Sequence, residues 1–208
     1  MLEIYLIRHG ETKSNVERRI QGQSDSLLTI NGIKQSQLTA KKIKMIGINY
    51  ILSSDLGRTK KTAKIIKKNC SCKIIFEKYL RELNMGILEG RMINSLNNIE
   101  KSWRNNLING IPNYRIPQGE SIEEITKRMF FILEKCYSFP KGSKLLLITH
   151  GIALNALFNY LLGRKYKKIN GFQLENCSIS KLDCIKKYYS KHFWSIKFIG
   201  DISHLSFF

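Results

Sequence analysis

The sequence predicts an α/β fold, a three-layer helix–sheet–helix sandwich with a mainly parallel sheet and an antiparallel edge. Short apolar runs, typical of strands buried on both faces, alternate with segments of helical periodicity. Near the end of the chain the pattern changes to alternating apolar and polar residues, which is typical of paired antiparallel strands. No repeat and no linker rich in proline or glycine interrupts the 208 residues. We therefore expect a single domain over residues 1–208.

The parallel part of the sheet accounts for most of the predicted elements. Buried strands are expected at residues 2–7, 48–52, 73–76 and 145–148. Helices are expected at residues 31–46, 56–68, 122–136 and 151–162. Gly47 is a stop signal for the first helix, and Ser121 with Glu124 matches the capping box that begins the third. The fourth helix is apolar nearly all round, so we expect it to be well buried.

The antiparallel edge is predicted from the alternation in residues 177–183 and 193–199, joined through residues 186–191. Lysines in the joining segment would discourage pairing with the edge of another sheet. One face of the second strand is expected to carry its apolar residues, Trp194, Ile196 and Phe198.

Lysine dominates the charge of the chain, which has a formal net charge of +19. Such a charge can attract anionic substrates or nucleic acids. The lysines, however, stand at spacings typical of solvated helix faces, and the excess of Lys, Ile and Asn is typical of an AT-rich genome. No zinc-knuckle spacing and no aromatic RNA-binding signature is present. We therefore expect no nucleic-acid partner, although the charge would help to recruit phosphate esters.

Targeting and cysteine patterns favour a cytoplasmic protein. No apolar stretch is long enough to span a bilayer, and Met1 leads straight into a strand, so we expect no membrane partner. The five cysteines include no Cys-x-x-Cys pair, and Cys70 and Cys72 bracket a single serine. Reduced and mostly buried thiols are therefore expected. The oligomeric state is not indicated.

Polar residues follow three of the predicted strands. Arg8-His9-Gly10 follows the first, Ser53-Ser54-Asp55-Leu56-Gly57-Arg58 the second, and Thr149-His150-Gly151 the last parallel one. Right-handed crossovers place the loops after parallel strands at one edge of the sheet, where ligands bind in open α/β folds. A histidine there can act as a nucleophile, an arginine can bind an anion, and a glycine lets the backbone approach closely.

These residues belong to a longer ordered set. Its other members are Glu11-Thr12, Asn15, Arg19-Ile20-Gln21-Gly22, Thr59 and Leu80-Arg81-Glu82-Leu83-Asn84-Met85-Gly86. Smaller similarities extend it with Gln118-Gly119-Glu120-Ser121, Asn176-Cys177-Ser178-Ile179 and Asp201-Ile202-Ser203-His204-Leu205. In type and order the set closely resembles the histidine phosphatase superfamily, also called phosphoglycerate-mutase-like.

The resemblance implies phosphoryl transfer through a phosphohistidine on His9. Neutral imidazole, with a reference pKa of about 6.5, is available as a nucleophile at physiological pH. Arg8 and Arg58 would clamp the phosphate with forked donors, and His150 would donate a hydrogen bond to the same oxygens. The chemistry needs no metal and no cofactor, and no metal-ligand spacing is visible.

The acid and the remaining ligands follow from the same resemblance. Glu82 is the expected proton donor to the leaving group and then the base for water, with Glu89 as a rival. Glu11 is expected to orient the loop rather than to take part in the chemistry. Further ligands of the phosphate oxygens are expected at Asn15, Gln21, Gly22 and Gly151.

The choice within the family favours a phosphatase. Mutases of the superfamily usually carry an arginine directly after the catalytic glutamate and paired arginines in a longer insert. Here Leu83 follows Glu82, and the arginines of the short insert are scattered, at Arg91, Arg104 and Arg115. Hydrolysis of a small phosphorylated metabolite is therefore expected, and α-ribazole phosphatases are among the most similar short members. A phosphoglycerate mutase is the alternative, and a non-catalytic binder of phosphate esters or nucleic acid is an alternative of another class.

Residues 90–116 are expected to cover the active site. Within them Trp103, Tyr114 and Arg115 are candidates to touch the organic part of the substrate. Packing in the core or on the surface is an equal alternative for each of the three.

Overall fold

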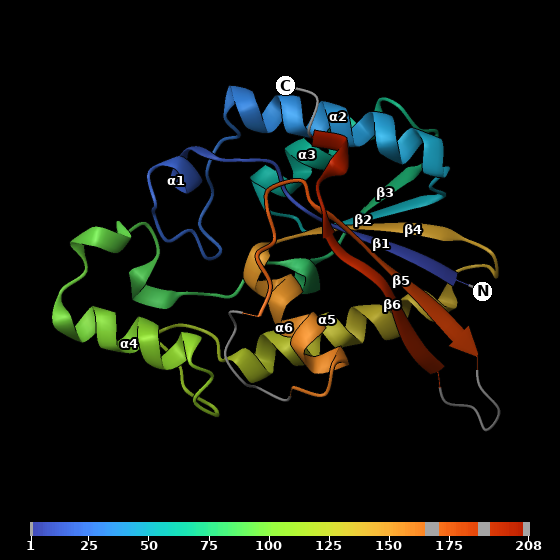
Figure 1. Cartoon of the computed structure of the whole chain (residues 1–208). Coiled ribbons are helices and arrows are strands. Elements are labelled where there is room, and N and C mark those ends of the chain that lie inside the picture. The colour runs from blue at the N-terminus through green and yellow to red at the C-terminus, as the bar shows by residue number, and fades with distance from the viewer. Residues whose placement is uncertain (1, 165–170, 187–191, 206–208) are drawn as a thin grey trace.

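The computed structural model describes residues 2–164, 171–186 and 192–205. Within them one sheet has the strand order β3-β2-β4-β1-β5-β6 (Figure 1). The strands are β1 (Leu2–Arg8), β2 (Tyr50–Ser53), β3 (Lys73–Phe76), β4 (Lys144–Thr149), β5 (Ile179–Lys186) and β6 (His192–Asp201). The first four run parallel, whereas β5 is antiparallel to β1 and β6 is antiparallel to β5. The predicted fold class is thus confirmed.

Helices cover both faces of this sheet. They are α1 (Lys13–Val16), α2 (Ile30–Ile46), α3 (Gly57–Lys67), α4 (Asn98–Ile108), α5 (Ile122–Lys135) and α6 (Gly151–Leu161). The pair α2 and α3 lies on one face and the pair α5 and α6 on the other, while α4 projects beyond the sheet (Figure 1). Single 3-10 turns lie at Lys78–Leu80, Gly86–Leu88, Ile93–Ser95, Cys136–Ser138 and Ser203–Leu205. A separate apolar core fills each face of the sheet.

Local sequence explains the helix ends. Gly47 ends α2 in the left-handed conformation, with φ of 75°, and its N–H donates to the carbonyl of Ile43. Ser121 and Glu124 form the predicted capping box at the start of α5. The middle of α6 is buried, as its nearly uniform apolar character predicts.

The edge strand β6 departs from the predicted alternation. Trp194 and Ile196 pack against the larger core, but Phe198 is 39% exposed, and Ile199 packs there instead. The register shifts at this point, because Ile196 pairs with Leu182 whereas Phe198 pairs with the preceding residue of β5. A bulge inserts one residue and so moves the following side chains to the other face. Residues 187–191 of the predicted connection lie outside the described residues.

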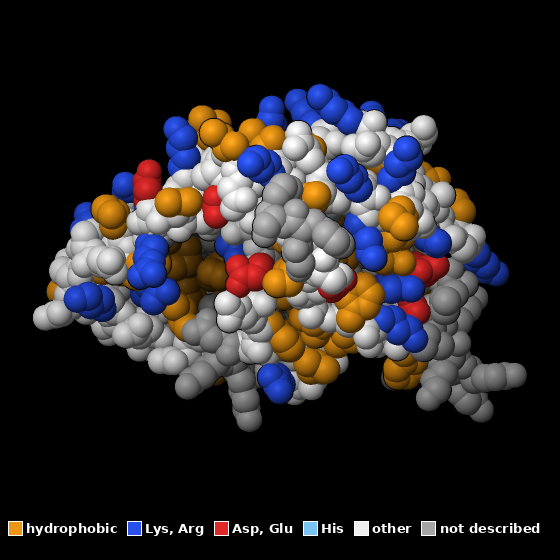
Figure 2. Space-filling view, turned by 45° about the horizontal axis from the view of Figure 1, so that its top comes forward, with side chains coloured by type: hydrophobic (Ala, Val, Ile, Leu, Met, Phe, Trp, Pro, Cys, Tyr) orange, Lys and Arg blue, Asp and Glu red, His pale blue; other side chains and the backbone are white. Residues whose placement is uncertain are grey.

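The structure also shows the helix lengths, the state of the cysteines and the charge of one face. In the part of the chain that the structure describes, no helix is long and apolar enough to cross a membrane. All five cysteines are free, with Cys70 half-buried and the other four buried. Figure 2 shows lysine and arginine side chains scattered over one face, and a hollow with an apolar floor near the α4 end of the molecule.

Candidate active site

The sheet brings the loops after three parallel strands together. Arg8 of β1 pairs with Thr149 of β4, and the N–H of His9 donates to the Thr149 carbonyl at 3.0 Å. The next loop is fixed in the same way, since the N–H of Ser54 donates to the carbonyl of Ile148 at 2.9 Å. The polar residues that follow β1, β2 and β4 therefore meet at the carboxyl edge of the sheet, as predicted.

His9 is buried and is held through one ring nitrogen. Its Nδ1 lies 2.8 Å from the carbonyl of Gly10, so Nδ1 carries the proton and donates it. Nε2 is then the basic nitrogen, and it has no hydrogen-bond partner among the described residues. Burial, together with the positive charges of Arg58 and Arg8, holds the pKa of His9 well below its usual value. The imidazole is therefore neutral at physiological pH, with a free lone pair.

Arg58 and His150 form a single hydrogen-bonded unit. Nε of Arg58 donates to Nδ1 of His150 at 3.2 Å, so the proton of this histidine resides on Nε2, which lies 2.9 Å from Oγ of Ser54. The two Nη atoms of Arg58 donate to the carbonyls of Ser24 and Gly22, each at 2.7 Å. Burial and the neighbouring Arg58 charge hold the pKa of His150 well below its usual value. Both ring nitrogens of His150 are thus engaged within the protein.

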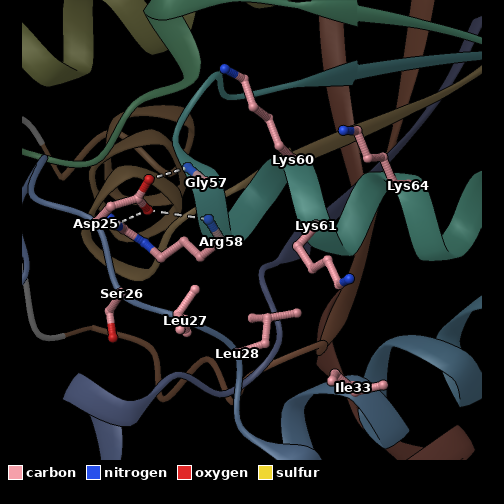
Figure 3. Close-up of a pocket in the computed structure, with 10 residues that line it drawn as sticks. All are labelled: Asp25, Ser26, Leu27, Leu28, Ile33, Gly57, Arg58, Lys60, Lys61 and Lys64. Atoms are coloured by element: carbon pink, nitrogen blue, oxygen red, sulfur yellow. Dashed lines mark hydrogen bonds and ion pairs between the residues drawn. The ribbon is translucent and has the colours of Figure 1, made fainter.

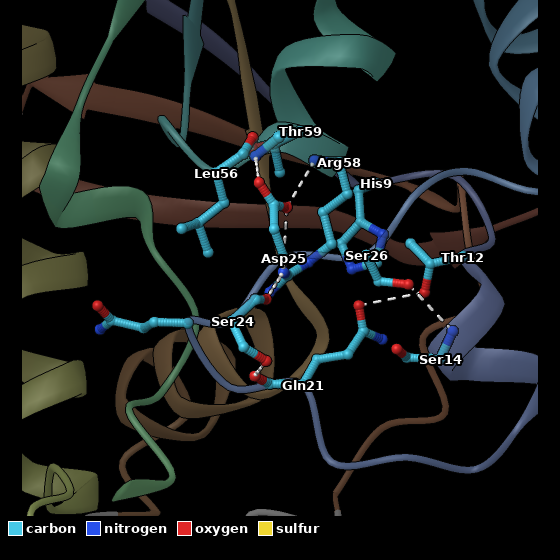
Figure 4. Close-up of polar contacts among 12 residues, drawn as sticks. His9, Thr12, Ser14, Gln21, Ser24, Asp25, Ser26, Leu56, Arg58 and Thr59 are labelled. Atoms are coloured by element: carbon cyan, nitrogen blue, oxygen red, sulfur yellow. Dashed lines mark hydrogen bonds and ion pairs between the residues drawn. The ribbon is translucent and has the colours of Figure 1, made fainter. Parts of the chain in front are cut away.

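Two carboxylates, those of Asp25 and Glu11, hold the loops around His9 and Arg58. Neither lines the cavity that contains His9, which is called the reaction cavity below. Asp25 accepts hydrogen bonds from the backbone N–H groups of Gly57 at 2.7 Å and Arg58 at 3.3 Å, at the first turn of α3 (Figures 3 and 4). This position suits a negative charge, because the N-terminus of a helix is electropositive. Glu11 accepts from Oγ1 of Thr29 at 2.6 Å, which agrees with its expected role in orienting the loop.

Arg8 carries a donor without a partner. Its Nη1 donates to the carbonyl of Leu174 at 2.7 Å, whereas its buried Nε has no partner among the described residues. Loss of hydration lowers the pKa of Arg8, and the negative charge of Glu82 partly offsets that effect. An enclosed donor of this kind is normally satisfied, so this Nε is available to an anionic ligand.

Glu82 lies against the first turn of α6. Its Oε1 accepts from the N–H groups of Leu83 at 3.0 Å and Ala153 at 2.9 Å, and its Oε2 accepts from Ile152 at 3.1 Å. These bonds fix the carboxylate at the wall of the cavity that also contains His9. The position suits a group that exchanges a proton with the substrate.

Glu89, the rival acid, has a structural position instead. Its Oε1 accepts from the N–H groups of Gln23 and Met85, and its Oε2 accepts from Ser24 at 2.8 Å. Gly22 has φ of 51°, and a β-carbon there would collide with this carboxylate. Glu89 does not line the reaction cavity; it shapes the loop whose carbonyls hold Arg58.

Asn15 and Gln21 present their amide groups to the cavity. The backbone N–H of Thr12 donates to Oδ1 of Asn15 at 3.1 Å, and the Thr12 hydroxyl donates to Oε1 of Gln21 at 3.1 Å (Figure 4). With both carbonyl oxygens engaged, the NH₂ groups remain as donors. The nearby Asn176 donates to the carbonyl of His9 at 2.9 Å. Thr12 and Asn176 therefore position the site, a role that the sequence alone did not reveal.

The cavity that joins these groups has a volume of about 380 Å³. Eight of the nine predicted site residues line it: Arg8, His9, Asn15, Gln21, Gly22, Arg58, Glu82 and Gly151. His150, the ninth, is fully enclosed, with its ring centroid 5.2 Å from that of His9. Its expected hydrogen bond to a phosphate oxygen thus requires a rearrangement of its contact with Ser54.

The mouth of the cavity is formed largely by residues that sequence analysis missed. Arg104, Leu107 and Ile108 of α4 line it together with Ile93 and Phe172. The guanidinium of Arg104 has no hydrogen bond or ion pair to the described residues, and burial lowers its pKa. Arg104, Leu107 and Ile108 are spaced three and four residues apart, which places them on one helix face. This spacing was the sequence signal that could have indicated a shared cavity wall.

The three residues proposed from residues 90–116 do not line this cavity. Trp103 and Tyr114 pack against the larger core, and Arg115 forms an ion pair with Glu124 at 2.9 Å. The packing alternative therefore applies to Trp103 and Tyr114.

A larger cavity of about 590 Å³ lies beside the N-terminus of α3. Leu27, Leu28 and Ile33 line it, and Lys61 extends toward them from α3 (Figure 3). Of the predicted site residues only Arg58 reaches it. It contains no histidine or glutamate, so the smaller cavity is the candidate active site.

Comparison with known proteins gives consistent matches. The profile of the histidine phosphatase superfamily (branch 1) matches residues 4–197. A protein of Escherichia coli (strain K12 / DH10B) named "Probable phosphoglycerate mutase GpmB" is 50% identical over 205 residues, covering 99% of this chain and 95% of that protein. The solved structure of Bacillus stearothermophilus YhfR has a TM-score of 0.91 at 25% identity, covering 99% and 100% of the two chains. The α-ribazole phosphatase from Shigella flexneri, at 23% identity and TM-score 0.82 over 96% of each chain, shares the fold.

Proposed function

We propose, since the chain belongs to the histidine phosphatase superfamily, that it is a phosphomonoesterase acting on small phosphate esters through a phosphohistidine on His9. The observation that carries the proposal is the neutral His9 ring with its free Nε2, at a cavity that Arg8, Arg58 and Glu82 also line. A nucleophile, a set of cationic donors and a proton-transfer group are what phosphoryl transfer requires.

The first half-reaction forms the phosphoenzyme. Nε2 of His9 attacks phosphorus in line with the ester oxygen, so an N–P bond forms as the P–O ester bond breaks. Arg8 and Arg58 stabilise the charge on the equatorial oxygens, with Nε of Arg8 gaining the acceptor that it lacks. Glu82 gives its proton to the departing alkoxide, which leaves as an alcohol.

The second half-reaction restores the enzyme. Glu82, now a carboxylate, takes a proton from water as the water oxygen attacks phosphorus. The N–P bond breaks, inorganic phosphate forms, and the proton on Glu82 is ready for the next cycle. His9 returns to the neutral tautomer that the Gly10 carbonyl selects.

Hydrolysis is favoured over transfer by the arginines of the insert. Arg91 pairs with Glu100 at 3.3 Å and Arg115 pairs with Glu124, so Arg104 alone of the three lines the cavity. The paired arginines that resemblance associates with mutases are thus not assembled there. Residues 90–116 would cover the cavity through α4, which supplies its apolar wall.

Phosphoglycerate mutase is the second candidate function. Two observations favour it: the name of the relatives that are 50% identical, and the unpaired cation of Arg104 at the cavity mouth. A carboxylate on the organic part of a substrate would match that cation. The same feature weighs against α-ribazole phosphate, whose base offers no second anion.

The deciding experiment uses purified protein with EDTA and follows phosphorus NMR signals. 3-Phosphoglycerate, p-nitrophenyl phosphate and α-ribazole phosphate are supplied separately, with and without 2,3-bisphosphoglycerate. Release of inorganic phosphate without formation of 2-phosphoglycerate supports the phosphatase. Rapid formation of 2-phosphoglycerate would establish the mutase, and binding without turnover would establish the non-catalytic alternative. Activity lost to EDTA and restored by Mg²⁺ or Zn²⁺ would refute the metal-free mechanism.

The sequence also indicates the kind of partner and the location of the protein in the cell. We propose that the partner is a small phosphorylated metabolite rather than a nucleic acid or a membrane, and that the protein is cytoplasmic. The size of the reaction cavity, and the scattering of Lys and Arg over the face that Figure 2 shows, support the small-metabolite part of this proposal.

A further inference from the structure

Cys70 and Cys72 lie where the chain turns from α3 into β3. Their Sγ atoms are 2.6 Å apart, so the two thiols are in direct contact. Backbone carbonyls lie on either side, with the Cys70 sulfur 3.7 Å from the carbonyl of Ile66 and the Cys72 sulfur 3.9 Å from that of Cys70. Side chains already in contact can be joined with little movement of the backbone, which is the main requirement for a disulfide.

The two thiols differ in their access to solvent. Cys70 is half-buried, whereas Cys72 is 4% exposed. Burial and the hydrogen bond with Cys70 raise the pKa of Cys72 to about 12. Because the thiolate is the reactive form, a reagent in solution meets Cys70 first, and Cys72 is placed to react with whatever forms there.

We propose that Cys70 and Cys72 form a site of reversible oxidation, at which a small disulfide such as oxidised glutathione converts the two thiols into an intramolecular disulfide. In the first step the Cys70 thiolate attacks one sulfur of the oxidant, forming a mixed disulfide and releasing one glutathione thiolate. In the second step Cys72 gives up its proton, its sulfur attacks Sγ of Cys70, and the second glutathione leaves. Two protein thiols are oxidised and one glutathione disulfide is reduced to two thiols.

The location separates this chemistry from the reaction cavity. Arg58 lies in the first turn of α3, whereas the cysteines follow its last turn, about 15 Å further along at 1.5 Å per residue. The inference does not rest on the proposed function, and the oxidised protein should hydrolyse p-nitrophenyl phosphate at the rate of the reduced protein.

The primary test uses the unmodified chain. The folded protein is incubated with oxidised glutathione and quenched in acid. It is then denatured, alkylated with iodoacetamide at a mildly alkaline pH and cleaved with trypsin. Lysines at 68 and 73 release both cysteines in one peptide, residues 69–73. This peptide should be about 2 Da lighter than its reduced form and unalkylated, and should accept two alkyl groups after dithiothreitol. The peptides with Cys136, Cys177 and Cys184 should be alkylated throughout.

Substitutions test the order of the two steps. Cys72→Ser should retain one glutathione on Cys70, because no second thiol can release it. Cys70→Ser should remain unmodified, and Cys184→Ser, a buried control, should oxidise like the parent. Double alkylation of peptide 69–73 after glutathione treatment would overturn the proposal. So would a disulfide between two protein molecules, or glutathione retained on the parent chain.

Discussion

The inner and outer halves of the reaction cavity are held by different kinds of structure. The inner half consists of Arg8, His9, Arg58 and Glu82. It comes from the end of β1, the start of α3 and the loop after the 3-10 turn Lys78–Leu80, and hydrogen bonds to backbone fix its groups. The outer half, Ile93, Arg104, Leu107, Ile108 and Phe172, comes from α4 and connecting segments away from the sheet. Under the proposed function, the register of the sheet would set the geometry of the reacting groups, and the residues of the outer half would select the ester.

Loss of the nucleophile is expected to have the largest effect. His9→Ala should abolish turnover of p-nitrophenyl phosphate and leave no acid-labile phosphoryl label on the protein, because no other neutral imidazole at the cavity has a free nitrogen. Quenched-flow labelling with ³²P-labelled substrate measures both. His204→Ala is the matched control: this buried histidine contacts Thr39 outside the cavity, so the variant should still be labelled. Acid-labile labelling of the His9→Ala variant would show that His9 is not the nucleophile.

Glu82→Gln tests the proton transfer. Without a proton donor, esters with poor leaving groups should slow by about 10²–10⁴ in kcat/KM, the usual contribution of general acid catalysis. p-Nitrophenyl phosphate should slow far less, because its leaving group needs little protonation. The comparison assumes that formation of the phosphohistidine limits the rate for alkyl esters.

Glu89→Gln is the control for this prediction. Its carboxylate holds Gln23 and Ser24, so the variant should lose stability without becoming sensitive to the leaving group. If the two variants show the same dependence on the leaving group, Glu82 is not the acid.

Arg58→Ala removes one of the charges around the phosphate. By analogy with loss of an oxyanion-hole donor, kcat should fall by about 10²–10³. Arg81→Ala is the matched arginine control: Arg81 forms an ion pair with Asp55 outside the cavity, so its removal should leave kcat nearly unchanged. Equal losses in the two variants, with unchanged melting temperature, would contradict the assignment.

The inner half could be predicted from sequence because strands impose it. Apolar runs identified β1, β2 and β4, and parallel pairing then required His9, Arg58 and His150 to lie at one edge. The sequence could not reveal that both nitrogens of His150 are engaged, because that depends on the side chains of Arg58 and Ser54 meeting in three dimensions.

The outer half could not be predicted with the same success. Trp103 and Arg104 are neighbours on α4, yet the first packs against the core and the second faces the cavity. Adjacent residues of a helix point about 100° apart, so the orientation of the helix decides between them. The capping box at Asn97 and Glu100 sets where α4 begins, but its orientation comes from tertiary packing.

Arg104→Ala tests the outer half directly. If its unpaired cation meets an anion on the substrate, kcat/KM should fall about tenfold for carboxylated esters, about 1.4 kcal/mol, and change little for neutral esters. Steady-state kinetics on 3-phosphoglycerate and glycerol phosphate make the comparison. Arg91→Ala, which removes an arginine paired with Glu100 outside the cavity, should affect neither ester. A loss that is equal for both esters would show that Arg104 does not distinguish them.

A change in salt concentration is expected to have the smallest effect on catalysis. Salt screens exposed charges more strongly than enclosed ones. Surface lysines such as Lys61 are exposed and so are screened by salt, whereas Arg58 is enclosed and is screened much less. Raising salt from about 50 to 200 mM should therefore lower kcat/KM only a few-fold and leave kcat unchanged. A protein that contacts several nucleic-acid phosphates instead loses about 10³–10⁵ in affinity over this range. Fluorescence anisotropy with labelled duplex and single-stranded DNA measures that alternative. Sub-micromolar binding with such a steep salt dependence would assign the positive charge to a nucleic-acid partner and contradict the proposed role in capturing small esters.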